Sequence, residues 1–196
     1  MDVPANSGKT VWLPRTGLLE PGDILLTRGV YGTSKKGTAL SRAIVGITGG
    51  AFDHAAICTS PPTCAEAGLG GVSTLSLART FAHDIANVRL LRVADQIAAA
   101  RAASLAQHQV SRPYSKLRAV SSVMKGVKVA PQDRGVFCSS LVAMVFRDAG
   151  APEFEGLIPD KTTPADLAAL PGLTDLTTRF LFSAVAPANI AAMSAL

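Results

Sequence analysis

Short blocks of apolar residues, separated by glycine, proline and charged residues, predict a chain built from short strands and helices. The segment from Asp23 to Thr27 follows a Pro-Gly turn and is typical of a buried strand. Two compact apolar runs, "DHAAIC" and "PTCAEA", flank the turn residues "TSP" and predict a hairpin. A further strand is expected at "NVRLLRV". The C-terminal run "RFLFSAVAPANIAAMSAL" is expected to supply a strand and an apolar piece docked on the body.

Apolar residues at helical spacing predict the helices. One helix is expected from Ala39 to Thr48, ended by two glycines. The alanine-rich "DQIAAARAASLAQHQV" predicts a second, with Asp95 as its N-cap. The clearest helix is "GVFCSSLVAMVFRDAG", whose apolar stripe comprises Leu141, Val142, Val145, Phe146 and Ala149. With a short helix at "PADLAALPG", these elements indicate an α+β fold, in which a small, mostly antiparallel sheet packs against helices.

The length and composition of the chain narrow its class. The 196 residues, 48% of them hydrophobic, predict a single domain over residues 1–196, with residues 1–18 as a candidate N-terminal arm. No apolar run approaches the roughly 18–20 residues that cross a bilayer, and the N-terminus lacks the pattern of a secretory signal. We therefore expect a soluble protein, cytoplasmic as synthesised, whose export would need a signal-independent secretion system. Three cysteines fit a reducing compartment better than a disulfide framework.

The predicted hairpin brings a histidine and a carboxylate together. If Cys58 pairs with Pro62, His54 lies directly opposite Glu66. Any antiparallel register whose paired numbers sum to an even value keeps these two side chains on one face, because side chains alternate with period two. A carboxylate beside an imidazole fixes its tautomer, orients the ring and stabilises its charged form. His54 and Glu66 are therefore a candidate base and its orienting residue.

Cys138 is the candidate nucleophile, because it begins the clearest predicted helix. A thiol at a helix N-terminus lies at the positive end of the helix dipole, which favours the thiolate, as does a neighbouring imidazolium. The same position offers free backbone N–H groups to an oxyanion. A cysteine at a helix N-terminus, packed on a sheet that carries a histidine and an acid, is the arrangement of a papain-like site.

Simpler interpretations of the same residues remain open. A cysteine on an apolar helical stripe is more often an inert core residue, and a single histidine is often buried and satisfied. Cys58 and Cys64 are expected in the core, although with His54 and Cys138 they offer donors for zinc. No close Cys-x-x-Cys pair supports a metal site, so we expect neither a metal nor another cofactor. His83 and His108 are interpreted as solvated.

Several motifs occur in an order that resembles a known family. They are "PGDILLTRG", "SRAIVGITGG", "FDHAAI", "CAEAGLGGV", "RPYS" and "FCSSLVAMVFRDAG", spread over roughly residues 20 to 150. The chain is similar here to the circularly permuted NlpC-type papain-like proteins, a group that includes YiiX-like predicted peptidases and relatives of lecithin:retinol acyltransferase. The resemblance implies a permuted papain-like fold with the histidine before the cysteine.

The same resemblance implies roles for individual residues. Cys138 matches the nucleophile, His54 the general base and Glu66 the polar third residue. Tyr114, and with it Ser139, are candidates for oxyanion or substrate contact. Relatives often have a serine where this chain has Asp53; that residue should point away from the His54 face, so it does not replace Glu66.

The expected activity is cysteine-dependent acyl transfer through an acyl-enzyme on Cys138. Hydrolysis of an amide, such as a cell-wall peptide bond of peptidoglycan, is the first expectation. A thioesterase or acyltransferase acting on an acyl lipid is the second, and an inactive papain-like module used for binding is the non-enzymatic alternative.

Charge adds one expectation about partners. A basic segment before the nucleophile suggests weak contact with an anionic surface, although a solvated basic face is the commoner outcome for such runs. Its residues are Arg112, Lys116, Arg118, Lys125 and Lys128. The net charge of +5 comes with only 5% aromatic residues and no recognition motif, so nucleic acid is not expected as a partner.

Overall fold

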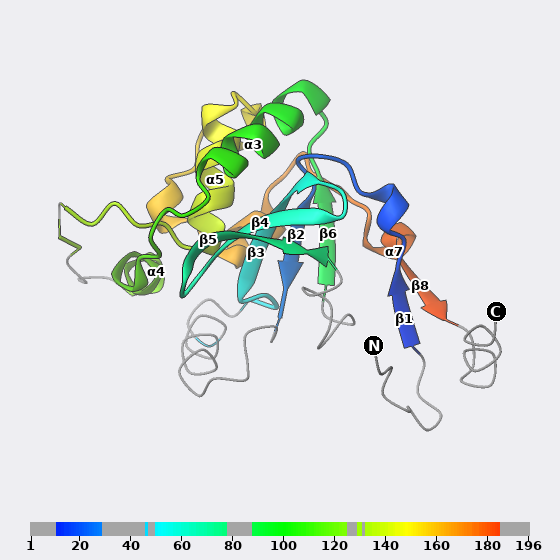
Figure 1. Ribbon diagram of the computed structural model, residues 1–196, viewed down its shortest axis with the longest axis horizontal. Coiled ribbons are helices and arrows are strands. Elements are labelled where there is room, and N and C mark those ends of the chain that lie inside the picture. The colour runs from blue at the N-terminus through cyan, green and yellow to red at the C-terminus, as the bar shows by residue number, and fades with distance from the viewer. Residues whose placement is uncertain are drawn as a thin grey trace.

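A six-stranded antiparallel sheet forms the centre of the computed structural model, which describes residues 11–28, 46, 50–77, 88–124, 129–130 and 132–184 (Figure 1). Its strand order is β5-β4-β3-β2-β6-β7. The strands are β2 (Ile24–Thr27), β3 (His54–Ser60), β4 (Thr63–Gly68), β5 (Gly71–Ser76), β6 (Val88–Arg92) and β7 (Thr174–Asp175). The sheet and its covering helices confirm the α+β class.

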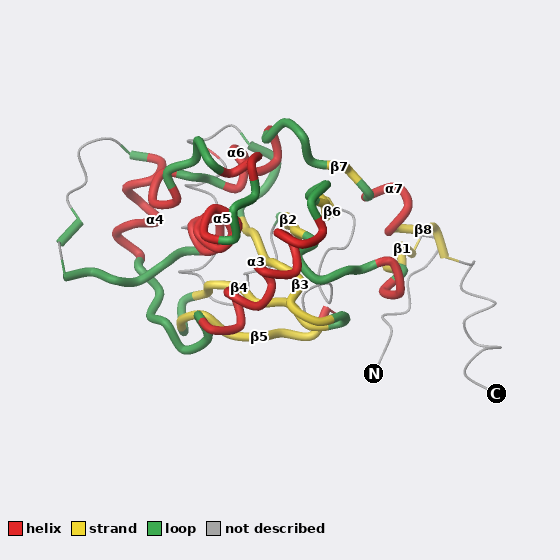
Figure 2. Tube along the Cα trace, turned by 90° about the horizontal axis from the view of Figure 1, so that it is seen from above, coloured by secondary structure: helices red, strands yellow, loops and turns green. Residues whose placement is uncertain are grey.

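Helices α3 (Gln96–His108) and α5 (Cys138–Asp148) lie together over one face of the sheet (Figures 1 and 2). The buried side of α3 consists of alanines, and these small side chains let α5 approach closely. The predicted apolar stripe of α5 is buried against the sheet; its members are Leu141, Val142, Val145, Phe146 and Ala149. The stripe therefore decides which way the N-terminal turn of α5 faces.

The opposite face of the sheet has its own apolar cluster. Leu25 and Leu90 pack there with Phe180 of α7 (Thr177–Phe180). Cys58 and Cys64 pair directly across β3 and β4 in the same cluster, and both are buried with free thiols. Their predicted place in the core is confirmed.

A two-stranded sheet joins the two ends of the described chain. Strand β1 (Val11–Pro14) pairs antiparallel with β8 (Leu181–Ala184), so part of the expected N-terminal arm is a strand. A 3-10 turn, η1 (Thr16–Leu18), follows, and the backbone N–H of Arg15 donates to the carbonyl of Phe180 at 2.8 Å. The strand predicted near the C-terminus is thereby confirmed as β8.

The remaining elements are short. They are α4 (Lys116–Val123), η3 (Pro152–Phe154), η4 (Pro159–Lys161) and α6 (Pro164–Ala169). The prediction of α6 is confirmed, whereas α4, α7, β1, β5 and β7 were not predicted. The Asp95 cap is confirmed too, since its carboxylate accepts from the backbone N–H groups of Ile97 at 2.9 Å and Ala98 at 3.0 Å.

Some expectations fall outside the described residues. The helix expected from Ala39 to Thr48 does so apart from Gly46, which is helical. His83, residues 1–10 and the apolar end 185–196 also lie outside. Within the part of the chain that is described, no helix has both the length and the apolar character to cross a membrane.

Candidate active site

The hairpin that carries His54 has a different register from the assumed one. Ala56 faces Glu66 and Cys58 faces Cys64, so the assumed pairing of Cys58 with Pro62 was wrong. Proline has no backbone N–H to contribute to a strand ladder, and Pro61 and Pro62 form the turn instead. The pair numbers from Ala56 to Cys58 still sum to an even value, so the argument that His54 and Glu66 share one face is unaffected.

His54 and Glu66 are therefore diagonal neighbours across β3 and β4. Diagonal positions are roughly 7–8 Å apart at the backbone, which a long side chain can bridge. Glu66 does so: its Oε2 lies 3.0 Å from Nε2 of His54, and both side chains are buried, with exposures of 6% and 5%. The carboxylate holds the imidazole and leaves the Nδ1 atom for another partner.

Cys138 is the first residue of α5, as predicted. The N-cap residue, Phe137, has an extended backbone and makes no side-chain hydrogen bond to the helix. Ser140 reaches back instead, and its Oγ accepts from the Phe137 backbone N–H at 2.8 Å. The backbone N–H groups of the first turn are thereby left for a ligand in front of Cys138.

Two backbone contacts fix the approach to this helix. Tyr114 and Val136 form a parallel β-bridge, in which the Ser115 N–H donates to the Val136 carbonyl at 3.0 Å. Gly135 makes this possible, because a Cβ there would lie 2.7 Å from the Ser115 backbone nitrogen. The bridge places Tyr114 beside the segment that leads into Cys138.

The thiol of Cys138 is close enough to the imidazole of His54 to act on its proton affinity. Burial alone would lower the pKa of His54, but the charge and hydrogen bond of Cys138, followed by those of Glu66, outweigh it. Together they raise the pKa of His54 from 6.5 to about 10. At neutral pH the imidazole therefore carries the proton.

This proton can be measured directly. The ring ¹⁵N signals of His54 should remain those of an imidazolium at pH 8, because that pH lies below the pKa of about 10. In Cys138→Ser the pKa of His54 should fall, because both contributions of the Cys138 thiol are lost while burial still lowers it. A His54 signal that titrates alike in both proteins would contradict the pairing.

Tyr114 and Ser139 differ in what they can offer a substrate. Burial and the negative charge of Cys138 raise the pKa of Tyr114, so its phenol keeps its proton and can donate near the nucleophile. Ser139 is fully buried, and its hydroxyl donates to the Thr162 carbonyl at 2.7 Å. Only the backbone N–H of Ser139 is therefore left for the expected oxyanion contact.

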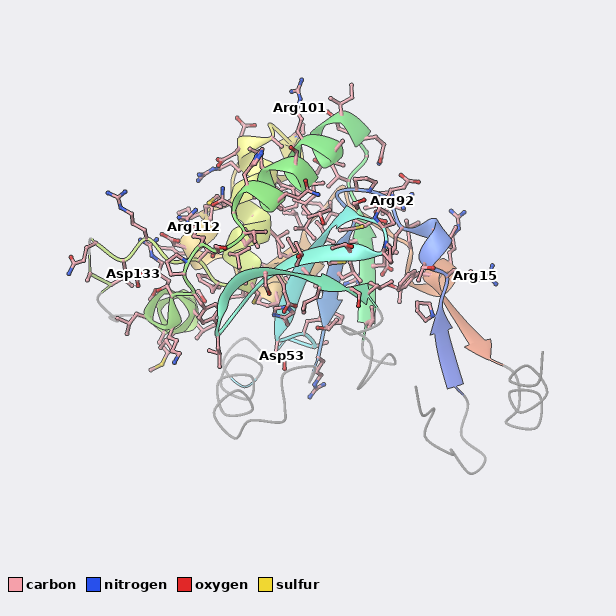
Figure 3. The ribbon with its side chains drawn as sticks, in the orientation of Figure 1. Arg15, Asp53, Arg92, Arg101, Arg112 and Asp133 are labelled. Atoms are coloured by element: carbon pink, nitrogen blue, oxygen red, sulfur yellow. The ribbon has the colours of Figure 1, made fainter. Side chains whose placement is uncertain are left out.

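Asp53 and His108, the other polar residues considered from the sequence, lie apart from these groups. Figure 3 shows Asp53 at the end of the sheet where β3 begins; its backbone N–H donates to the Thr27 carbonyl at 3.1 Å. His108 is exposed at the end of α3, as predicted. Within the described ranges, no three His, Cys, Asp or Glu side chains are grouped as metal ligands.

The basic segment is partly used within the fold. Arg112 donates to the Arg134 carbonyl and to Gln109, both at 2.8 Å, beside α3 and α5 (Figure 3). Arg118 pairs with Asp160 and donates to the carbonyl of Asp133. Lys116 is exposed, whereas Lys125 and Lys128 lie outside the described residues. Two of the five cations expected on an anionic surface are thus engaged in intramolecular contacts.

Thr27 is the polar neighbour of the site that sequence analysis did not single out. It ends the predicted strand and lies directly opposite His54 in the β2–β3 pair. Only the register of these two strands, which their sequences do not determine, would have revealed it.

Comparisons with family models and with curated proteins give no relative for the chain. No family model matches it, and no curated protein matches its sequence. The site must therefore be interpreted from its own geometry.

Proposed function

We propose that the chain is a cysteine-dependent acyl-transfer enzyme, with a permuted papain-like fold, that hydrolyses an amide bond. One observation carries the proposal: Cys138, at a helix N-terminus, interacts with an imidazole that the Glu66 carboxylate also holds. A cluster that served only packing would not place a nucleophile, a charged imidazole and a carboxylate together, because burying charged groups is costly.

In the first half of the reaction, the Cys138 thiolate attacks the acyl carbon. The developing oxyanion accepts hydrogen bonds from the first-turn N–H groups of α5 and from the Tyr114 phenol. His54 already holds a proton, which it donates to the leaving amine as the C–N bond breaks. The product is a thioester on Cys138 and a neutral imidazole.

In the second half, water replaces the amine. His54 takes a proton from the water while its oxygen attacks the thioester carbon, and the C–S bond then breaks. The carboxylic acid product leaves, and the thiolate–imidazolium pair is restored. Glu66 keeps the imidazole in position through both steps.

The first substrate class is a peptide or related amide, such as the stem peptides of peptidoglycan, whose carboxylates suit a basic neighbourhood. A lipid thioester or ester is the second. The exposed side of α4 supports it: Leu117 is 51% exposed and Met124 after the helix is 49% exposed, beside the exposed Lys116. An apolar stripe flanked by a cation is typical of a surface that contacts anionic lipid.

Mass spectrometry of the intact protein tests the proposal. The purified chain is incubated with muropeptides and, separately, with acyl lipids and acyl thioesters, and products and Cys138 adducts are followed. We expect turnover of one pool, with a transient acyl group on Cys138. Turnover of the lipid pool alone would favour the second class. Failure to turn over either pool or to form an adduct would favour a binding module.

A further inference from the structure

Thr27 carries a buried hydroxyl that has no hydrogen-bond partner in the described part of the chain. The residue is 1% exposed, and its Oγ1 is one of two buried side-chain oxygen atoms without a partner among the described residues. Its three neighbours in β2, Ile24, Leu25 and Leu26, are apolar and fully buried. Valine has the same shape as threonine, so the hydroxyl costs stability here without improving the packing.

The position of this hydroxyl relates it to the proposed reaction. Thr27 pairs directly with His54, and directly opposed residues of an antiparallel pair project from the same face, with Cβ atoms roughly 4.5–5.5 Å apart. Glu66, His54 and Thr27 thus form a row on three adjacent strands, β4, β3 and β2. Glu66 flanks the imidazole on one side, and the Thr27 hydroxyl flanks it on the other. Side-chain alternation puts this row on the same face as Leu25, and His54, the first residue of β3, is the member of the row that interacts with Cys138.

We propose that Thr27 positions the water that hydrolyses the acyl-enzyme, an inference that rests on the proposed function. The Thr27 Oγ1 holds the water beside His54 through a hydrogen bond. His54 removes one water proton, the oxygen forms a bond to the thioester carbon, and the C–S bond breaks. The hydroxyl proton of Thr27 is not transferred. Thr27 is a positioning residue for the second half of the reaction alone.

The test separates acylation from deacylation with p-nitrophenyl acetate. In Thr27→Val the initial burst of p-nitrophenolate should equal that of the wild type, because acylation does not involve the water. The steady-state rate should fall about tenfold, the value of one hydrogen bond of ordinary strength. Acetylated Cys138 should accumulate in the mass spectrum. Thr27→Ser, which keeps the hydroxyl, should retain most of the wild-type rate.

Hydroxylamine distinguishes positioning of water from damage to the site. This amine attacks the acetyl-enzyme itself, so it should restore the turnover of Thr27→Val to the wild-type level at the same hydroxylamine concentration. The variant should also melt no lower than the wild type, because it removes an unpaired buried hydroxyl. Thr59→Val is the matched control: Thr59 donates to the Thr63 carbonyl at 3.2 Å, so its loss should lower stability and leave turnover unchanged.

The outcomes are distinguishable. A wild-type protein that shows no burst and no acetyl group on Cys138 contradicts the proposed function. A wild-type burst with an unchanged steady-state rate in Thr27→Val contradicts the role of Thr27 alone. A Thr27→Val rate that stays low in hydroxylamine means that His54 has been displaced, and this too overturns the inference.

Discussion

Cys138→Ala should lower turnover on the order of 10⁴-fold or more, because removing the nucleophile of a catalytic set costs nearly all of its catalysis. The fold should persist, since the rest of α5 stays anchored through Leu141, Val145 and Phe146, all essentially inaccessible to solvent. Steady-state kinetics on the substrate identified by mass spectrometry, with circular dichroism for helix content, would measure both. The variant should also form no acyl adduct.

Cys58→Ala is the matched control for this loss. It removes another buried sulfur, from strand β3, and the register pairs Cys58 with Cys64. The hydrogen bond with the neighbouring Cys58 thiol, together with burial, raises the pKa of Cys64, so the Cys64 thiol keeps its proton and is no nucleophile. Cys58→Ala should therefore keep its turnover. Activity that survives in Cys138→Ala, or disappears equally in Cys58→Ala, would show that the nucleophile lies elsewhere.

Glu66→Asp should lower kcat on the order of 100-fold, because the shorter side chain draws its carboxylate about one methylene away from His54. Ala56, and not His54, is the residue directly opposite Glu66. Glu66 therefore needs the full length of its side chain to reach the His54 ring. Glu66→Gln keeps the length and an amide oxygen to accept from Nε2. It should lose about tenfold, the difference between a charge-assisted and a neutral hydrogen bond.

The order of these two variants is the informative result. If the length of the side chain at position 66 is decisive, Glu66→Gln has a higher kcat than Glu66→Asp. The NMR signals of the His54 ring should then shift more in Glu66→Asp than in Glu66→Gln. An Asp variant that works as well as wild type would mean that Glu66 does not orient the ring. Thermal melts of both proteins serve as controls, since each loses part of the same buried hydrogen bond.

The hairpin shows which part of the site could be predicted from the sequence. Alternation of side chains places His54 and Glu66 on one face for every even register, so their proximity follows from residue spacing alone. The register itself depends on which residues form the turn. "TSPPT" offers several choices, and a bulge between Cys58 and Ser60 shifts the ladder further. For this reason the prediction that His54 lies directly opposite Glu66 was wrong.

The contact between Cys138 and His54 could not be predicted from local sequence patterns alone. Helical periodicity predicts the buried stripe of α5 and puts Cys138 at its first turn, but not the point on the sheet above which that turn lies. That point is set by tertiary contacts such as the Tyr114–Val136 bridge and the close approach at Gly135. Strand β5 escaped prediction because "GVSTLS" contains few apolar residues, and it borders the sheet with four of six residues outside the core.

The pairing of β1 with β8 has a practical consequence for handling the molecule. Val11 and Ala184 face each other as a register pair, so the described chain enters and leaves at neighbouring points, roughly 5 Å apart for such a pair. The segment from Val11 to Ala184 has ends close enough to be inserted into a surface loop of a host protein with short linkers. Such a chimera would carry the Cys138 site within the host protein. The two parts of the host would then be joined to β1 and to β8, so the pairing of these strands would bring the two parts together and report their proximity.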